Sequence, residues 1–66
     1  MVETANITIA IGDHDVDVYV EGNYPYIDDW RIYRGSRRMR GLEKWIWRDK
    51  KRLDAFLDEI YWVLSQ

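Results

Sequence analysis

Hydrophobic residues alternate with polar or small residues in two short stretches of the N-terminal third. The hydrophobic members of the two runs are Ile7, Ile9, Ile11, Val16, Val18 and Val20. A period of two is typical of strands that bury one face. The residues between the runs, 12–15, read GDHD and have the composition of a turn. The pattern therefore predicts a β-hairpin with one face made of Ile and Val.

A third strand is predicted over residues 29–34, which read DWRIYR and are followed by a Gly-Ser pair. The residues before it, 22–26, read GNYPY and indicate a loop or turn. The Tyr24–Pro25 peptide bond in this stretch is able to adopt the cis form, although trans is the default.

Residues 42–64 fit a helical period, but one helix over this whole range raises two problems. The apolar positions that define the period are Leu42, Ile46, Leu53, Phe56, Leu57, Ile60 and Leu64. A single helix would place Asp49 inside the apolar stripe, where an unpaired carboxylate is costly to bury. It would also be about 35 Å long, which is long for so small a domain.

Both problems disappear if Asp49 is the N-cap of a helix over residues 50–65. Residues 42–47 then become a fourth strand or an extended lead-in. The favoured fold is α+β: a small antiparallel sheet, with the N-terminal hairpin and one or two further strands, covered by one C-terminal helix. A hairpin followed by one long helix is the alternative. The 66 residues form a single domain, 1–66, with a thin core, because a chain of this length buries only about 60% of its unfolded surface.

Charge is segregated into three blocks along the chain. Residues 1–30 contain seven acids and no Lys or Arg, residues 31–52 contain all ten basic residues and two acids, and residues 53–66 contain three acids. The block charges of −7, +8 and −3 add to the net charge of −2. Such asymmetry concerns association with partners rather than the fold.

The basic segment, residues 31–52, has two interpretations. In the first, its cations pair with the seven acids of residues 1–30. In the second, it binds an anionic partner, because Arg and Lys interleaved with aromatic residues suit phosphate contacts and base stacking. The basic residues proposed for partner binding are Arg34, Arg37, Arg38, Arg40, Lys50 and Lys51. The net charge of −2 argues against nucleic acid as that partner.

The first turn of the predicted C-terminal helix is basic, with Lys50, Lys51 and Arg52 in sequence. The helix macrodipole disfavours cations at this end by about 0.3–1 kcal/mol each. An anion at this end would relieve the mismatch, whether it is a phosphate, a carboxylate of a partner, or the carboxylates of Asp28 and Asp29 in this chain.

An acidic face is predicted on the second strand and the turn before it. Its members are Asp13, Asp15, Asp17 and Glu21. Carboxylates on one face of a strand recur about every 6.7 Å, so that the series resembles a phosphate backbone or suits a basic surface of a partner. The alternative is a solvated strand face that prevents edge aggregation.

Trp47 and Trp62 lie off the apolar stripe of the C-terminal half. Exposed indoles often anchor protein interfaces. The alternatives are that Trp62 covers the end of a thin core, or that both tryptophans pack in a homodimer.

No catalytic, cofactor or metal-ligating set is present. The chain has no Cys and one His, and its two serines lie outside any nucleophile motif. We therefore expect a protein that is not an enzyme and that needs no metal or cofactor. The N-terminus has no signal-peptide pattern and no apolar run is long enough to span a membrane, so we expect a cytoplasmic protein with no membrane partner.

The sequence thus favours a small interaction protein that binds a larger protein or complex and modulates or inhibits it. Its length, its lack of cysteine and its segregated charge resemble the general character of phage or mobile-element inhibitors. A nucleic-acid-binding module that uses residues 31–52 is the alternative. A homodimer, in which the acidic hairpin of one subunit meets the basic segment of the other, is a third hypothesis.

Overall fold

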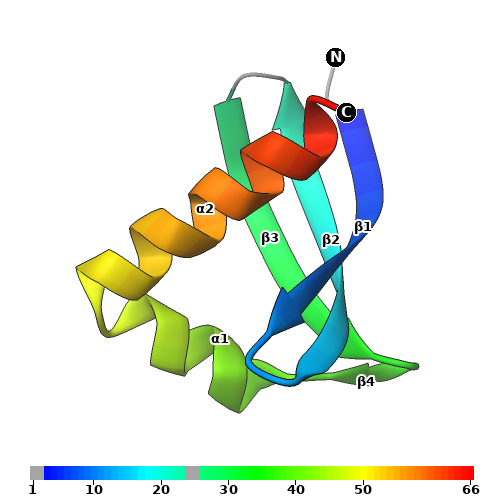
Figure 1. Cartoon of the computed structure of the whole chain (residues 1–66). Coiled ribbons are helices and arrows are strands. Elements are labelled where there is room, and N and C mark those ends of the chain that lie inside the picture. The colour runs from blue at the N-terminus through cyan, green and yellow to red at the C-terminus, as the bar shows by residue number, and fades with distance from the viewer. Residues whose placement is uncertain (1–2, 24–25) are drawn as a thin grey trace.

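Four antiparallel strands form one sheet in the order in which they occur along the chain. The computed structural model describes residues 3–23 and 26–66. The elements are β1 (Glu3–Ile11), β2 (His14–Asn23), β3 (Tyr26–Arg34), β4 (Arg37–Arg38), α1 (Arg40–Trp47) and α2 (Lys50–Leu64). Both helices lie on the same side of the sheet (Figure 1). This arrangement confirms the predicted α+β fold.

The predicted hairpin is formed by β1 and β2. Ile7 lies opposite Val18 and Ile9 lies opposite Val16, so that the hydrophobic residues share the inner face. The two-residue turn begins with Gly12 at a φ of +61°, the left-handed value that a type II′ turn requires at its first central position. Here, the alternation of hydrophobic and polar residues correctly predicted both the strands and the buried face.

The third strand starts earlier than predicted, at Tyr26 rather than residue 29. Trp30 and Ile32 point from β3 into the core. The pairing of β3 with β2 shifts register between Glu21 and Gly22, so that Glu21 lies opposite Asp29 and Gly22 lies opposite Ile27. Tyr24 and Pro25, where the sequence allows a cis peptide bond, lie outside the described residues.

Residues 42–47, predicted as a fourth strand or an extended lead-in, are helical and belong to α1. The fourth strand is instead β4, which consists of Arg37 and Arg38. The helix is favoured because it places Met39, Leu42, Glu43 and Ile46 against the sheet at helical spacing. A strand over the same residues would put Leu42 and Glu43 on opposite faces. The single covering helix of the prediction is therefore a pair of helices.

Asp49 separates the two helices and caps α2, as predicted. Its backbone is extended, with φ −127° and ψ 116°, and its carboxylate accepts a hydrogen bond from the Lys51 N–H at 2.9 Å. The helix then runs diagonally across the inner face of the sheet and ends beside β1 (Figure 1). No helix of the described residues is long and apolar enough to cross a membrane.

The core lies between the sheet and the two helices. Its buried members are Ile9, Val16, Val18, Val20, Trp30, Ile32, Ile46, Phe56 and Ile60. Each of the first three strands contributes to this core, and each helix contributes at least one side chain. The aromatic rings of Trp30 and Phe56 contact each other at a centroid distance of 4.6 Å and link β3 to α2.

Candidate interaction surfaces

The charges exposed on α1 are all positive, and two tryptophans of this helix, Trp45 and Trp47, are exposed with them. We call the outward face around Trp47 the basic–aromatic surface, and its members are Arg40, Lys44, Trp47 and Arg48, all of which are exposed. Spacings of four, three and one residues place these side chains on one side of the helix and its C-terminal end. The one acid of α1, Glu43, points inward and is buried.

Trp47 is exposed but fixed. The residue is 61% exposed, yet its ring stacks on that of Trp30, with 5.6 Å between centroids and 11° between planes. Trp30 is only 6% exposed and belongs to the core. One face of the Trp47 indole therefore packs on the protein and the other remains open. An aromatic ring held in this way loses little conformational entropy when it binds.

Arg38, which the sequence analysis assigned to partner binding, forms an ion pair with Glu43 of the same chain. Its Nη2 lies 3.0 Å from Oε1 of Glu43, and its Nε donates to Oε2 at 3.1 Å. Glu43 also accepts a hydrogen bond from the backbone N–H of Ile32 at 3.1 Å. Burial raises the pKa of Glu43, but the bonds from Arg38 and Ile32 outweigh it and hold that pKa below its ordinary value.

Arg52 also binds groups of the same chain, namely Trp45 and Asp49. Its guanidinium carbon lies 4.0 Å from the centroid of the Trp45 ring, and its Nη1 donates to the Trp45 carbonyl at 2.6 Å. Its Nε lies 3.4 Å from Oδ2 of Asp49. The carboxylate at the first turn of α2 is thus the N-cap Asp49, and not Asp28 or Asp29 as the sequence suggested; Asp29 pairs with Arg31 instead. Lys50 and Lys51 remain exposed beside it.

Most of the basic segment does not pair with the acids of residues 1–30. Within the described chain, the ion pair that joins the two blocks is Arg31 with Asp29, at 3.4 Å. The other described pairs, Arg38–Glu43 and Arg52–Asp49, lie inside the basic segment. Arg34 and Arg37 are exposed at the two ends of the β3–β4 turn and have no described carboxylate within 4.0 Å.

The acidic residues lie on another face of the molecule. Asp15 and Asp17 project from β2 on the outer face of the sheet, Glu21 follows on the same face, and Asp13 sits in the turn. Asp17 accepts a hydrogen bond from the Thr8 hydroxyl at 3.4 Å. The structure therefore separates the predicted acidic face from the basic–aromatic surface, because one lies on the sheet and the other on the helical layer.

Trp62 is the second exposed indole of the predicted set and lies apart from Trp47. It is 61% exposed and projects from the C-terminal half of α2. The structure does not bring the two tryptophans together in one patch, since α1 and α2 diverge from their junction at Asp49 (Figure 1).

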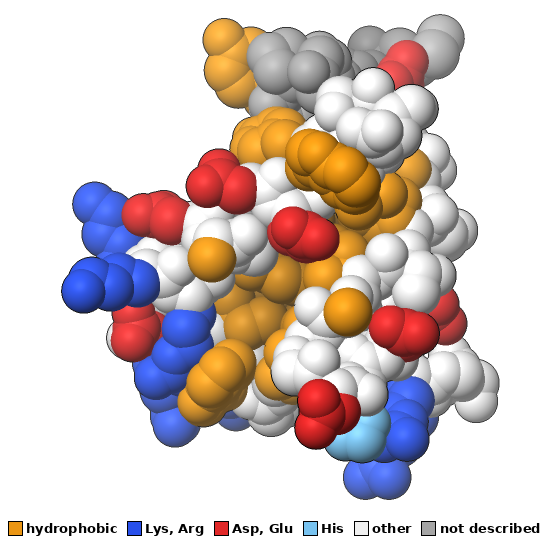
Figure 2. Space-filling view, in the orientation of Figure 1, with side chains coloured by type: hydrophobic (Ala, Val, Ile, Leu, Met, Phe, Trp, Pro, Cys, Tyr) orange, Lys and Arg blue, Asp and Glu red, His pale blue; other side chains and the backbone are white. Residues whose placement is uncertain are grey.

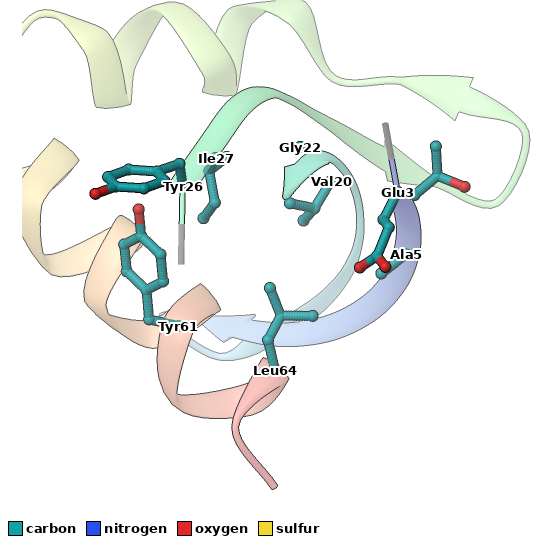
Figure 3. Close-up of a pocket in the computed structure, with 9 residues that line it drawn as sticks. Glu3, Ala5, Val20, Gly22, Tyr26, Ile27, Tyr61 and Leu64 are labelled. Carbon is teal, nitrogen blue, oxygen red and sulfur yellow. The ribbon is translucent and has the colours of Figure 1, made fainter. Parts of the chain in front are cut away.

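A small hollow lies between the C-terminal end of α2 and the end of the sheet. Its volume is about 170 Å³, and its apolar lining includes Val20, Ile27 and Leu64. Figure 3 shows Tyr61 of α2 directed toward Tyr26 of β3 on one side of it. The polar side chains of the lining are the hydroxyls of Thr4, Tyr26 and Tyr61 and the carboxylate of Glu3.

Sequence reasoning did not single out five residues that shape these surfaces: Trp30, Glu43, Lys44, Trp45 and Arg48. Lys44 and Arg48 lie in the basic segment, but only the helical conformation of α1 aligns them with Arg40. Trp30 has a sequence signal, because it alternates with Ile32 on the inner face of a strand. Glu43 has a weaker one, since it shares a helix face with Ile46. The contact of Trp45 with Arg52 depends on the bend between the helices and has no signal in the sequence.

No family model, no curated protein and no solved structure matches this chain.

Proposed function

We propose that this protein is a small non-enzymatic binding protein that docks on a larger protein or complex and modulates it, with the basic–aromatic surface of α1 as the contact. The supporting observation is the state of Trp47, which is 61% exposed but stacked on the buried ring of Trp30. Indole rings held rigidly at the surface are the residues that contribute most to binding energy at protein interfaces.

The charges around Trp47 define the partner's chemistry. Arg40, Lys44 and Arg48 flank the indole and have no carboxylate within 4.0 Å in the described part of the chain. A partner surface with an apolar recess and acidic residues at its rim would match them. Complementary charge of this kind accelerates association and selects the partner, while the buried ring supplies affinity.

The test is a quantitative pull-down from lysate of the protein's own host with three immobilised forms. The Lys44→Glu/Arg48→Glu variant reverses two charges of the surface. The Lys50→Glu/Lys51→Glu variant makes the same change in net charge on the first turn of α2. We expect a partner that the unchanged protein and the second variant retain and that the first variant loses. Equal retention by all three forms would contradict the proposal.

A second candidate function, nucleic-acid binding, is favoured by the spacing along α1. Arg40, Lys44 and Arg48 follow one another at four-residue intervals, which corresponds to about 6 Å along a helix. This distance is close to the separation of successive phosphates, and the open face of Trp47 is able to stack on a base. Cations that contact phosphates and an exposed aromatic ring are the parts that single-strand binding requires.

Fluorescence anisotropy with labelled single- and double-stranded DNA and RNA separates the two candidates. Nucleic-acid binding would fall steeply with salt, with a slope of about −0.7 per neutralised phosphate on a single strand. It would also be lost in the Lys44→Glu/Arg48→Glu variant. No change in anisotropy at any salt concentration would exclude this second candidate and leave the protein partner.

A further inference from the structure

The two edges of the sheet differ in how their backbone groups are satisfied. At the β3 edge, β4 pairs with the last two residues of β3, Tyr33 and Arg34. Hydrogen bonds from other parts of the chain occupy backbone groups of β3 that precede this pairing. Met39 N–H donates to the Ile32 carbonyl at 2.8 Å, and Glu43 accepts from the Ile32 N–H. The Asp29 carboxylate accepts from the Trp30 N–H at 2.9 Å. The edge of β3 is therefore occupied from Trp30 to Arg34, and the part before it carries the charged residues Asp28 and Asp29, which disfavour pairing with another strand.

The β1 edge has no such protection. Its nine residues pair with β2 in one unbroken register, and from Thr4 to Ile11 they contain no charge and no proline. Ile11 and His14 flank the two-residue turn and form the first hydrogen-bonded pair of the hairpin. Because such pairs recur at every second residue, the odd-numbered residues of β1 direct their backbone N–H and C=O groups to β2. The groups that point to the free edge belong to Thr4, Asn6, Thr8 and Ala10. Proteins ordinarily protect such an edge with charge, proline, a bulge or a short strand.

An open apolar cleft lies next to the end of this edge. Figure 2 shows hydrophobic side chains in the hollow between α2 and the β1–β2 hairpin. The cleft has a volume of about 350 Å³ and is lined by Ile9 and Ile11 of β1 and by Ala55, Phe56 and Glu59 of α2, among others. The inner face of the sheet is therefore incompletely covered at the strand whose edge is free.

We infer that β1 pairs with β1 of a second copy of this chain, antiparallel about a two-fold axis, so that the two sheets become one. The register that uses every free backbone group places Ile7 opposite Ile7 of the second copy. In this register Asn6 pairs with Thr8, and Thr4 pairs with Ala10, in both directions across the axis. The contact is isologous, the commonest arrangement of homodimers.

The properties of β1 itself select a second copy as the occupant. The strand complements itself, since its four edge-facing residues pair with one another in a single register. Their side chains are uncharged, so that no like charges meet when two identical strands are brought together. Both copies would have their clefts on the same face of the joined sheet, where Ile7 and Ile11 are only partly buried in the single chain.

The first test measures mass in solution by sedimentation equilibrium. We expect the unchanged chain to sediment at twice its mass of 8.1 kDa. The Asn6→Lys/Thr8→Lys variant places lysines opposite one another at the centre of the contact, and it should sediment as a monomer with its circular dichroism retained. The control Asp28→Asn/Ser36→Lys raises the net charge equally on exposed residues away from β1, and it should remain a dimer.

Two results would overturn the inference: a monomeric unchanged chain up to millimolar concentration, or a dimer that persists in the folded Asn6→Lys/Thr8→Lys variant. If that variant does not fold, the mass of the unchanged chain and the cross-linking test below still decide the question.

The second test measures the register by disulfide formation. The chain has no cysteine, so an introduced thiol has no other thiol of the same chain to react with. Ile7→Cys would place two thiols at a pair of residues without mutual hydrogen bonds, whose Cα atoms are about 4.5 Å apart. Ile11→Cys would separate its two thiols by about 26 Å along the joined strands. We expect mild oxidation to cross-link the first variant and not the second. Equal cross-linking of both would contradict the register and the inferred dimer.

Discussion

The carboxylate of Glu43 in α1 accepts a hydrogen bond from the backbone N–H of Ile32 in β3, at 3.1 Å. The same carboxylate holds the guanidinium of Arg38, so that one side chain joins α1 to both β3 and β4. Glu43 is 8% exposed, and it is the buried charged residue of the described chain. This contact orients α1 and therefore the surface that α1 presents.

Replacing Glu43 by Ala should destabilise the fold by about 1–3 kcal/mol, because the Ile32 N–H would be left buried without an acceptor. Urea unfolding followed by tryptophan fluorescence measures the effect. The matched control is Glu59→Ala, which removes an exposed acid of α2 and should change the free energy of unfolding by less than about 0.5 kcal/mol. Equal effects of the two substitutions would show that the Glu43 contact does not stabilise the fold.

The same carboxylate should make stability depend on pH at acid values. Because folding lowers the pKa of Glu43 below its ordinary value of 4.5, the unfolded chain binds the proton more readily. The stabilisation is therefore complete above that ordinary value and is lost as pH falls through the lower pKa of the folded state. Urea unfolding of the protein and of Glu43→Gln between pH 7 and pH 2 should show a difference that shrinks on acidification. A constant difference would contradict this assignment.

Trp47→Ala should destabilise the protein by about 0.5–1.5 kcal/mol, because it removes the ring that stacks on Trp30. Trp62→Ala, which removes an equally exposed indole outside this stack, should have a smaller effect on the free energy of unfolding. Thermal unfolding of both variants by circular dichroism compares them directly. If the two variants have the same midpoint, the Trp47 ring is not held by Trp30 in solution.

Gly22→Ala should be strongly destabilising, by about 1–3 kcal/mol, because Gly22 has a φ of +150°. A Cβ atom at this position would also lie 2.5 Å from the Tyr26 carbonyl oxygen. Gly41→Ala is the control: a Cβ atom there meets nothing within 4 Å, and alanine in a helix is favoured over glycine by about 1 kcal/mol. We expect opposite changes in the urea midpoint. Similar changes would contradict the backbone conformation at Gly22.

Local patterns in the sequence were sufficient for the elements whose signal lies in neighbouring residues. The hairpin followed from the alternation around Gly12, and the start of α2 followed from a single carboxylate, Asp49, at the one point where a continuous helix would have buried it. The position of Trp47 off the apolar stripe was also correct, since the indole is exposed. Periodicity and capping are properties of a few consecutive residues, and they survive whatever the rest of the chain does.

Only the tertiary structure decided the conformation of residues 42–47 and the state of the basic segment. Leu42 and Ile46 are four residues apart and suit either a strand or a helix, and the choice depends on Glu43, whose partners Ile32 and Arg38 come from β3 and β4. Trp47 acquires its rigidity from Trp30, seventeen residues earlier in the chain. The sequence by itself determined the local elements, because backbone preference and side-chain period act over a few residues. The contacts that orient α1, and with it the cations on its outward face, join residues that are distant in the sequence. They therefore form only when the sheet and the helices pack together.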